Sequence, residues 1–179
     1  MSGTFYRSLS KAITLILGAM MSILQSCSTT SIDEQLANQI AAAFVKEQKQ
    51  RYKLQVCGVG GSIPDKIRKF HFDFDLIMRV DREQAREIYV DMLEHFLQMV
   101  NSDEEIRPYL ENYPVTNANV EILLTFCDKP LQRVPPPYMA FVFGCKNSIV
   151  YDQWDPVTEK FCDAYHELYA DALKIVRGY

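Results

Sequence analysis

Residues 70–76, Phe-His-Phe-Asp-Phe-Asp-Leu, alternate apolar and polar side chains without exception. Successive side chains on a β-strand point to opposite sides, so this alternation predicts a strand with one face on a core and one in water. The three phenylalanines would face the core, while His71, Asp73 and Asp75 would face solvent. A sheet with one wet face is typical of antiparallel architectures.

The clearest helical pattern covers residues 82–101, where apolar residues recur at i, i+3, i+4 and i+7. Asp81 precedes this run and supplies a cap. A second helix is predicted over residues 32–50, because Ser31 and Glu34 have the spacing of a capping box.

Further strands are predicted at residues 51–60, at 120–126, and in a late hairpin of 138–145 and 148–154. Asp155 followed by a proline has the form of a helix start, so a last helix is expected from there. The strands come in hairpins and not as alternating βαβ units. We therefore predict an α+β fold with a five-stranded, mainly antiparallel sheet and helices packed on one face. Residues 32–179 would form this single domain.

Residues 1–26 differ in composition from the rest of the chain. Arg7 and Lys11 precede an apolar run of 13 residues, Ala12–Leu24. A charged start, an apolar core of about 7–15 residues and a small residue before the cut make up a signal peptide. The run is shorter than the roughly 18 residues that suggest a membrane span. We predict a cleaved signal peptide over residues 1–26, with an uncleaved anchor or a buried helix as alternatives.

The end of this segment, Leu-Gln-Ser-Cys at residues 24–27, resembles the lipobox of bacterial lipoproteins. In that family the cysteine receives a diacylglycerol, a peptidase cuts just before it, and the new amino terminus is acylated. The resemblance implies that Cys27 is lipidated, that residues 27–31 form a short tether, and that the protein is anchored to the cell membrane. Ser28 after the cysteine implies the outer membrane in preference to the inner one. Several acyl chains on one residue hold a protein stably at a membrane, because each buried CH₂ contributes about 0.8 kcal/mol to the binding free energy.

A block in the body resembles an uncharacterised family of small lipoproteins from chlamydia-type intracellular bacteria. The resemblance rests on Ile106–Leu110, Tyr113–Thr116, Asn119–Ile122 and the glycine-containing segment Cys57–Gly61. It covers about residues 45–155. It implies no activity, and it agrees with an envelope location.

Charge excludes one large class of partners. Residues 1–26 carry two basic and no acidic residues, which leaves 17 Lys and Arg against 23 Asp and Glu, a net charge of −6. A nucleic-acid-binding protein presents a basic face, so no nucleic-acid partner is expected. Attraction to anionic lipid is not expected either, and the lipid itself must hold the protein at a membrane.

Four cysteines follow Cys27, namely Cys57, Cys127, Cys145 and Cys162. An even number in an exported protein allows two disulfides, although buried free thiols are also common. Cys57 and Cys127 are predicted on the polar faces of their strands and are the preferred disulfide pair. No CxxC spacing supports a zinc or thioredoxin-like site.

Cys57 and His71 are predicted on adjacent strands, on the face away from the core. A thiol beside an imidazole can act as nucleophile and base, with Asp73 orienting the ring. His71, Asp73 and Asp75 lie about 6.6–7 Å apart along one strand, which is wider than the ligand shell of one metal ion. We therefore predict no metal site and no cofactor.

Two other patterns have ordinary explanations. The glycines of residues 58–61 do not have the spacing of a dinucleotide-binding site, and no long helix follows them. This pattern predicts a tight connection with positive φ. Tyr138, Tyr151 and Trp154 suggest an exposed aromatic patch around the late hairpin, or packing beneath the last helix.

These observations predict a noncatalytic, lipid-anchored cell-envelope protein that serves as an interaction or structural module, with an envelope protein as its possible partner. One alternative is a small thiol-dependent hydrolase or redox protein that uses Cys57 and His71. Another is a ligand- or glycan-binding lipoprotein that uses the aromatic residues of the hairpin.

Overall fold

A mixed sheet forms the centre of the molecule, with strand order β1-β2-β3-β5-β6-β7 and β4 paired to β3. The computed structural model describes residues 30–178, without the side chains of residues 163 and 164. The predictions for residues 1–29, including cleavage and the lipidation of Cys27, lie outside the described residues. The elements are α2 (Ile32–Arg51), β1 (Leu54–Ser62), β2 (Lys69–Ile77), α3 (Arg82–Ser102), η1 (Arg107–Tyr109), η2 (Asn117–Asn119), β3 (Val120–Lys129), β4 (Gln132–Arg133), β5 (Phe141–Cys145), β6 (Ser148–Asp155), β7 (Lys160–Leu168) and α4 (Tyr169–Arg177).

The α+β class is confirmed, and the sheet is mainly antiparallel. Strands β2 and β3 pair in parallel, because α3 carries the chain back to the starting end of the sheet. The other paired strands are antiparallel. The predicted count of five strands is wrong, since the sheet contains seven.

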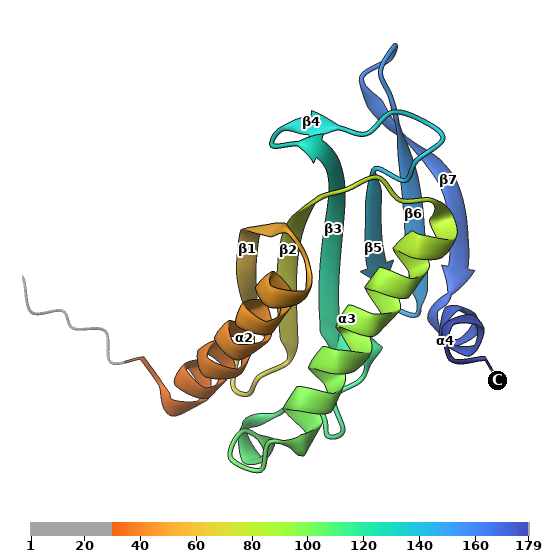
Figure 1. The fold of residues 1–179 in the computed structure, drawn as a ribbon. Coiled ribbons are helices and arrows are strands. Elements are labelled where there is room, and N and C mark those ends of the chain that lie inside the picture. The colour runs from red at the N-terminus through yellow and green to blue at the C-terminus, as the bar shows by residue number, and fades with distance from the viewer. Residues whose placement is uncertain (1–29, 179) are drawn as a thin grey trace, which may run out of the picture. The chain divides into compact units, whose positions relative to one another are not determined.

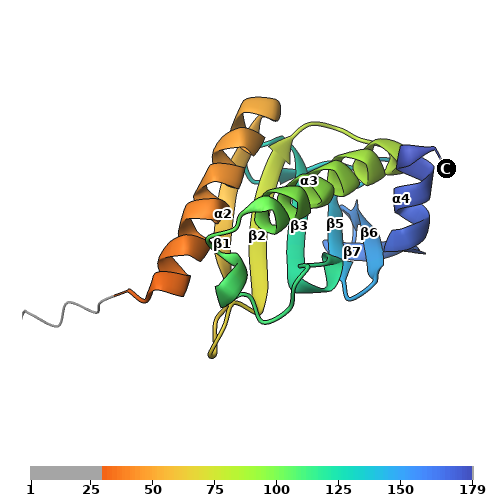
Figure 2. The ribbon, with the colours of Figure 1, turned by 90° about the horizontal axis from the view of Figure 1, so that it is seen from below.

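Helices α2, α3 and α4 lie on one side of the sheet, as Figures 1 and 2 show from two directions. Within residues 30–178, the opposite face carries no helix. We call this second surface the open face. Among the described residues, no helix combines the length and the apolar character needed to cross a bilayer.

The core forms where the phenylalanines of β2 meet the helices. Phe72 is fully buried, and its ring lies 4.8 Å from the rings of both Phe44 in α2 and Phe96 in α3. These contacts are edge-to-face, an arrangement that aromatic pairs favour. Phe70 and Phe74 point the same way and are buried as well. The inward face predicted from the alternation of residues 70–76 is confirmed.

Helix α3 begins where its capping box predicts. The Asp81 carboxylate accepts a hydrogen bond of 2.8 Å from the backbone N–H of Gln84, and the Gln84 side chain accepts one of 3.1 Å from the Asp81 N–H. Two backbone donors that the helix leaves unpaired are thereby satisfied.

The predicted last helix is wrong over its first half, because residues 160–168 form strand β7. Asp155 does accept hydrogen bonds, from the Val157 N–H at 2.8 Å and the Thr158 hydroxyl at 2.7 Å. Those bonds stabilise a hairpin turn, and Glu159 then adopts a φ of 53°, which a continuing helix excludes. A carboxylate that caps a helix can equally close a turn.

The glycine-containing segment is also not the connection that was predicted. Gly58, Gly60 and Gly61 all lie within β1, and positive φ is found at Gly178 rather than at any of them. Gly61 is needed for close approach, because a Cβ there would lie 2.3 Å from the carbonyl oxygen of Lys69 in β2.

Candidate functional site

The open face carries three neighbouring groups of side chains. The register brings His71 of β2 opposite Glu121 of β3, and Leu123 of β3 opposite Phe143 of β5. Phe143 in turn lies opposite Val150 of β6. These residues alternate with buried ones along their strands, so they share the face that the helices leave uncovered.

The first group is an aromatic cluster of Phe141, Phe143, Trp154 and Phe161. The ring of Phe141 lies 5.4 Å from that of Phe143 and 5.2 Å from that of Phe161, and Trp154 is 5.3 Å from Phe161. The guanidinium of Arg133 lies over two of these rings, at 5.4 Å from Trp154 and 4.5 Å from Phe161. Such cation–π contacts favour a fixed guanidinium orientation. Phe161 remains 37% exposed, and the other three are half-buried.

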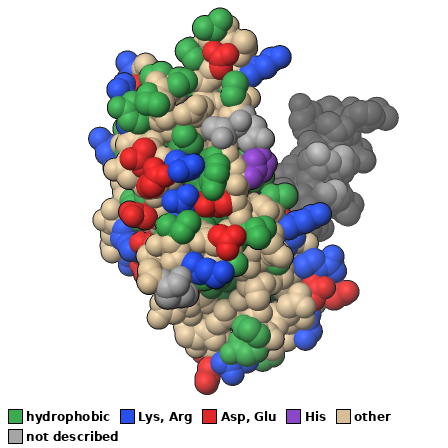
Figure 3. Space-filling model, turned by 90° about the vertical axis from the view of Figure 1, so that its right-hand side faces the viewer, with side chains coloured by type: hydrophobic (Ala, Val, Ile, Leu, Met, Phe, Trp, Pro, Cys, Tyr) green, Lys and Arg blue, Asp and Glu red, His purple; other side chains and the backbone are tan. Residues whose placement is uncertain are grey.

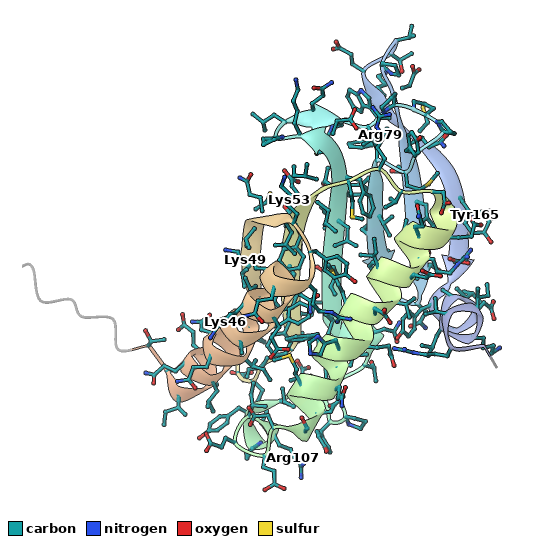
Figure 4. All side chains as sticks on the ribbon, viewed as in Figure 1. Lys46, Lys49, Lys53, Arg79, Arg107 and Tyr165 are labelled. Carbon is teal, nitrogen blue, oxygen red and sulfur yellow. The ribbon has the colours of Figure 1, made fainter. Side chains whose placement is uncertain are left out.

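This cluster only partly matches the predicted aromatic patch. Tyr151 is fully buried, and its hydroxyl donates a 2.5 Å hydrogen bond to Glu167. Tyr138 lies under Arg79, whose guanidinium is 5.3 Å from the ring; Arg79 is labelled at the upper end of the sheet in Figure 4. Of the three aromatic residues predicted, Trp154 alone belongs to the cluster.

Phe141, Phe143 and Phe161 were not among the residues predicted for the aromatic patch. Phe141, Val142 and Phe143 are consecutive apolar residues, a pattern that indicates a strand with apolar side chains on both faces. Phe161 lies within the segment predicted as the last helix, and a helix would not place it opposite Trp154 as the β6–β7 pair does.

The second group surrounds a cavity of about 600 Å³ at the end of the open face near η2 and the β5–β6 turn. Leu123 and Phe143 contribute apolar lining, and Lys69, His71 and Glu121 contribute charged groups. Lys69 forms an ion pair with Glu121, and His71 Nδ1 lies 3.6 Å from the same carboxylate. The hydrogen bond from Lys69 is the main reason that the pKa of Glu121 falls below its ordinary value.

The third group, which we call the thiol–carboxylate cluster, consists of Cys57 of β1 with Asp73 and Asp75 of β2. One ligand atom from each residue lies within 4.8 Å of the other two. A β-bulge between Val56 and Gly58 leaves Cys57 without a Cα partner on β2. Burial is the main cause of a raised pKa for Cys57 and for Asp73, and Asp75 raises both further.

The structure does not bring Cys57 and His71 together as a nucleophile and its base. In the register of β1 and β2, His71 lies opposite Gly60, while Cys57 lies beside Asp73 and Asp75. A reactive thiol requires a lowered pKa, because the thiolate is the nucleophile. Burial and Asp75 instead raise the pKa of Cys57, so this geometry does not support thiol catalysis.

The two cysteines of the preferred disulfide pair also lie far from each other. Cys57 and Cys127 are both free thiols, and β2 lies between their strands. Two strand spacings amount to roughly 9–10 Å, whereas the Cα atoms of a disulfide are about 4.4–6.8 Å apart. The disulfide stays a prediction that this arrangement does not favour. Cys145 and Cys162 are exposed free thiols.

Other surfaces are less specific. The side of the molecule formed by β7 and α4 mixes acidic, basic and hydrophobic side chains (Figure 3). Lys46 and Lys49 are exposed on α2 (Figure 4). Mixed and solvated charges of this kind are ordinary on protein surfaces, so the open face is the candidate site.

No family model, no curated protein and no solved structure matches this chain. The function is therefore inferred from the sequence and from the geometry of the described residues.

Proposed function

We propose that this chain is a lipid-anchored cell-envelope protein that uses the open face of its sheet to bind a partner protein, without catalysis. The observation that carries the proposal is the aromatic cluster. Four aromatic side chains and Arg133 gather on a surface that no helix covers within residues 30–178. Aromatic residues and arginine are enriched at protein interfaces and dominate their binding energies.

The anchor is proposed from the sequence pattern before Cys27. Residues 27–31 separate that cysteine from α2, which starts at Ile32. A tether this short would keep the domain close to the membrane surface, within reach of other envelope proteins. The outer membrane is the proposed location, on the basis of Ser28.

The partner can be tested with a photo-crosslinking amino acid placed at Phe161 in the native host. Phe161 is 37% exposed within the aromatic cluster, so we expect a specific crosslinked product that mass spectrometry identifies as an envelope protein. The same amino acid at Lys174, which is exposed on α4, is the control. Equal crosslinking at both positions, or none at Phe161, would contradict the proposed surface.

The anchor requires a separate measurement. Intact-mass analysis of material from the native host should show a chain that begins at Cys27 and carries acyl groups. A Cys27→Ser variant should lose the acyl groups and leave the membrane fraction. An unprocessed, unacylated wild-type chain would overturn the proposed anchor and location. The crosslinking experiment would still test the partner surface, because it does not depend on the anchor.

A ligand-binding role is the second candidate, and the cavity beside the cluster favours it. Its volume of about 600 Å³ lies within the roughly 300–1,000 Å³ typical of small-molecule sites. Phe143 belongs to both the cavity lining and the aromatic cluster. A small molecule that co-purifies with the protein and is lost in a Leu123→Arg variant would support this role over a protein partner.

A further inference from the structure

We propose that the cavity of about 600 Å³ on the open face binds a small molecule that combines an apolar body with one anionic group, such as a carboxylate or a sulfonate. The assignment rests on the ligand-binding role of the same cavity, the second candidate function, and adds the chemical class of the ligand. It is independent of the lipid anchor.

The apolar part of the cavity is formed by β3 and β5. Leu123 of β3 and Phe143 of β5 lie opposite each other in the strand register, are half-buried, and both line the cavity. The ring of Phe143 also lies 5.4 Å from that of Phe141, so this lining continues into the aromatic cluster. Apolar walls with a few placed polar groups are typical of small-molecule sites. These side chains would contact the apolar body of the ligand.

Charged groups also line the cavity, and their sum is positive. Lys69 and Lys146 contribute two positive charges against the one negative charge of Glu121, a net charge of +1 with His71 neutral. The whole chain has a net charge of −4, so the cavity differs in sign from the molecule around it. A concave site with one predominant sign of charge concentrates ligands of the opposite sign. This lining therefore favours an anion.

The single acidic group of the lining is already compensated by its neighbours. Lys69 forms an ion pair with Glu121, and His71 Nδ1 lies 3.6 Å from the same carboxylate. His71 is also the residue that the parallel register of β2 and β3 places opposite Glu121. Because these contacts neutralise the carboxylate, it opposes a bound anion only weakly.

Lys146 has no such counter-charge. It is exposed in the β5–β6 turn and forms no ion pair with the acidic side chains that the structure describes. Its position is fixed from two sides. Asn117 of η2 donates a 3.1 Å hydrogen bond to the Lys146 carbonyl oxygen, and the Tyr169 N–H of α4 donates one of 2.8 Å to the Asn147 carbonyl oxygen. The turn thereby keeps an unpaired cation at the cavity, where it can contact the anionic group of the ligand.

Two fluorescent dyes that share one apolar body test the assignment. Anilinonaphthalene sulfonate carries a sulfonate, and phenylnaphthylamine has the same rings without it. Fluorescence titration of the full chain should show saturable binding of the sulfonate dye, at least about fivefold tighter than that of the neutral dye. Added salt should reduce this difference, because salt screens the charges.

Two pairs of variants locate the binding. Lys146→Glu should weaken binding of the sulfonate dye by at least about fivefold and leave the neutral dye unchanged. Lys46→Glu makes the same charge change at an exposed lysine of α2 and should affect neither dye. Leu123→Gln should weaken both dyes by a similar factor, because it removes apolar lining without adding charge. Its matched control is Leu131→Gln, at a residue that is 96% exposed between β3 and β4.

Circular dichroism of each variant separates loss of a ligand contact from loss of the fold. Equal affinity for the two dyes, or equal weakening of the sulfonate dye by Lys146→Glu and Lys46→Glu, would overturn the anionic class and leave a ligand site in the cavity. Absence of saturable binding of both dyes, or binding that Leu123→Gln does not change, would overturn the ligand-binding role itself.

Discussion

Arg86 in α3 and Glu167 in β7 form a buried bidentate ion pair, with distances of 2.8 Å from Nε to Oε1 and 3.1 Å from Nη2 to Oε2. The two side chains are only 6% and 5% exposed. The Tyr151 hydroxyl donates to the same carboxylate. The partners are 81 positions apart in the sequence. The pair therefore holds the last strand of the sheet against the helix layer.

Replacing Arg86 with methionine would leave the carboxylate of Glu167 buried without a counter-charge. We expect Arg86→Met to lower the free energy of unfolding by about 3–5 kcal/mol, measured by chemical denaturation. Arg82→Met is the control, since Arg82 is more exposed and stacks over Tyr165 at 4.4 Å; its effect should stay below about 1 kcal/mol. Similar losses in both variants would contradict the structural role of the buried pair.

Gly144 in β5 has no room for a side chain. A Cβ there would lie 1.9 Å from the hydroxyl oxygen of Tyr89, which is itself buried in α3. We expect Gly144→Ala to cost about 1–3 kcal/mol of stability through overpacking. The added variant Tyr89→Phe removes the clashing oxygen and should recover part of that loss.

Gly60→Ala provides the matched control for this substitution. A Cβ at Gly60 would meet no atom within 4 Å, so stability should change by less than about 0.5 kcal/mol. If Gly144→Ala lowered stability as little as Gly60→Ala, that result would contradict the close approach of Tyr89 in α3 to Gly144 in β5.

The ion pair between Arg79 and Asp128 should make stability depend on pH. Arg79 donates to both carboxylate oxygens, at 2.6 and 2.8 Å, and these hydrogen bonds lower the pKa of Asp128. A lowered pKa means that the folded protein favours the ionised form. The stabilisation is therefore present above the pKa of the unfolded chain and is lost as the pH falls through the lower folded value.

Denaturation of wild type and Asp128→Asn across this pH range checks the sign. The wild type should be the more stable at neutral pH, and the difference should shrink as the solution becomes acidic. Arg79 is half-exposed, so added salt should also reduce the difference. A difference that grows toward acidic pH would contradict the pairing.

The thiol of Cys57 should react slowly for an exposed cysteine. Its pKa is raised by burial first and by Asp75 next, so little thiolate is present at neutral pH. Asp75→Asn should speed the alkylation of Cys57, because one source of repulsion is gone. Mass spectrometry of timed samples gives the rate at each cysteine. Faster alkylation in the wild type than in Asp75→Asn would contradict this account and favour an activated thiol.

Local patterns predicted those parts of the fold in which a single segment carries the whole signal. The alternation in residues 70–76 and the capped, one-sided pattern of residues 82–101 correspond to β2 and α3. Both elements bury one face, and that requirement is visible in the order of apolar and polar residues.

Signals that depend on a distant partner were missed. Residues 160–168 carry apolar side chains at helix-like intervals, yet they form a strand because β6 offers hydrogen bonds along its whole edge. The spacing of His71, Asp73 and Asp75 describes one strand by itself and carries no information about Cys57 on the neighbouring strand. The bulge that brings Cys57 to Asp73 and Asp75 depends on the pairing of β1 with β2.

The sequence by itself determined the α+β class, the inward face of β2 and the start of α3, because hydrophobic periodicity and capping act within a few consecutive residues. The tertiary structure alone decided that residues 160–168 join the sheet, that Tyr151 is buried while Phe161 stays exposed, and that a thiol meets two carboxylates. Each of these outcomes depends on contacts between strands, and the energy of such contacts is not recorded in any single segment of the chain.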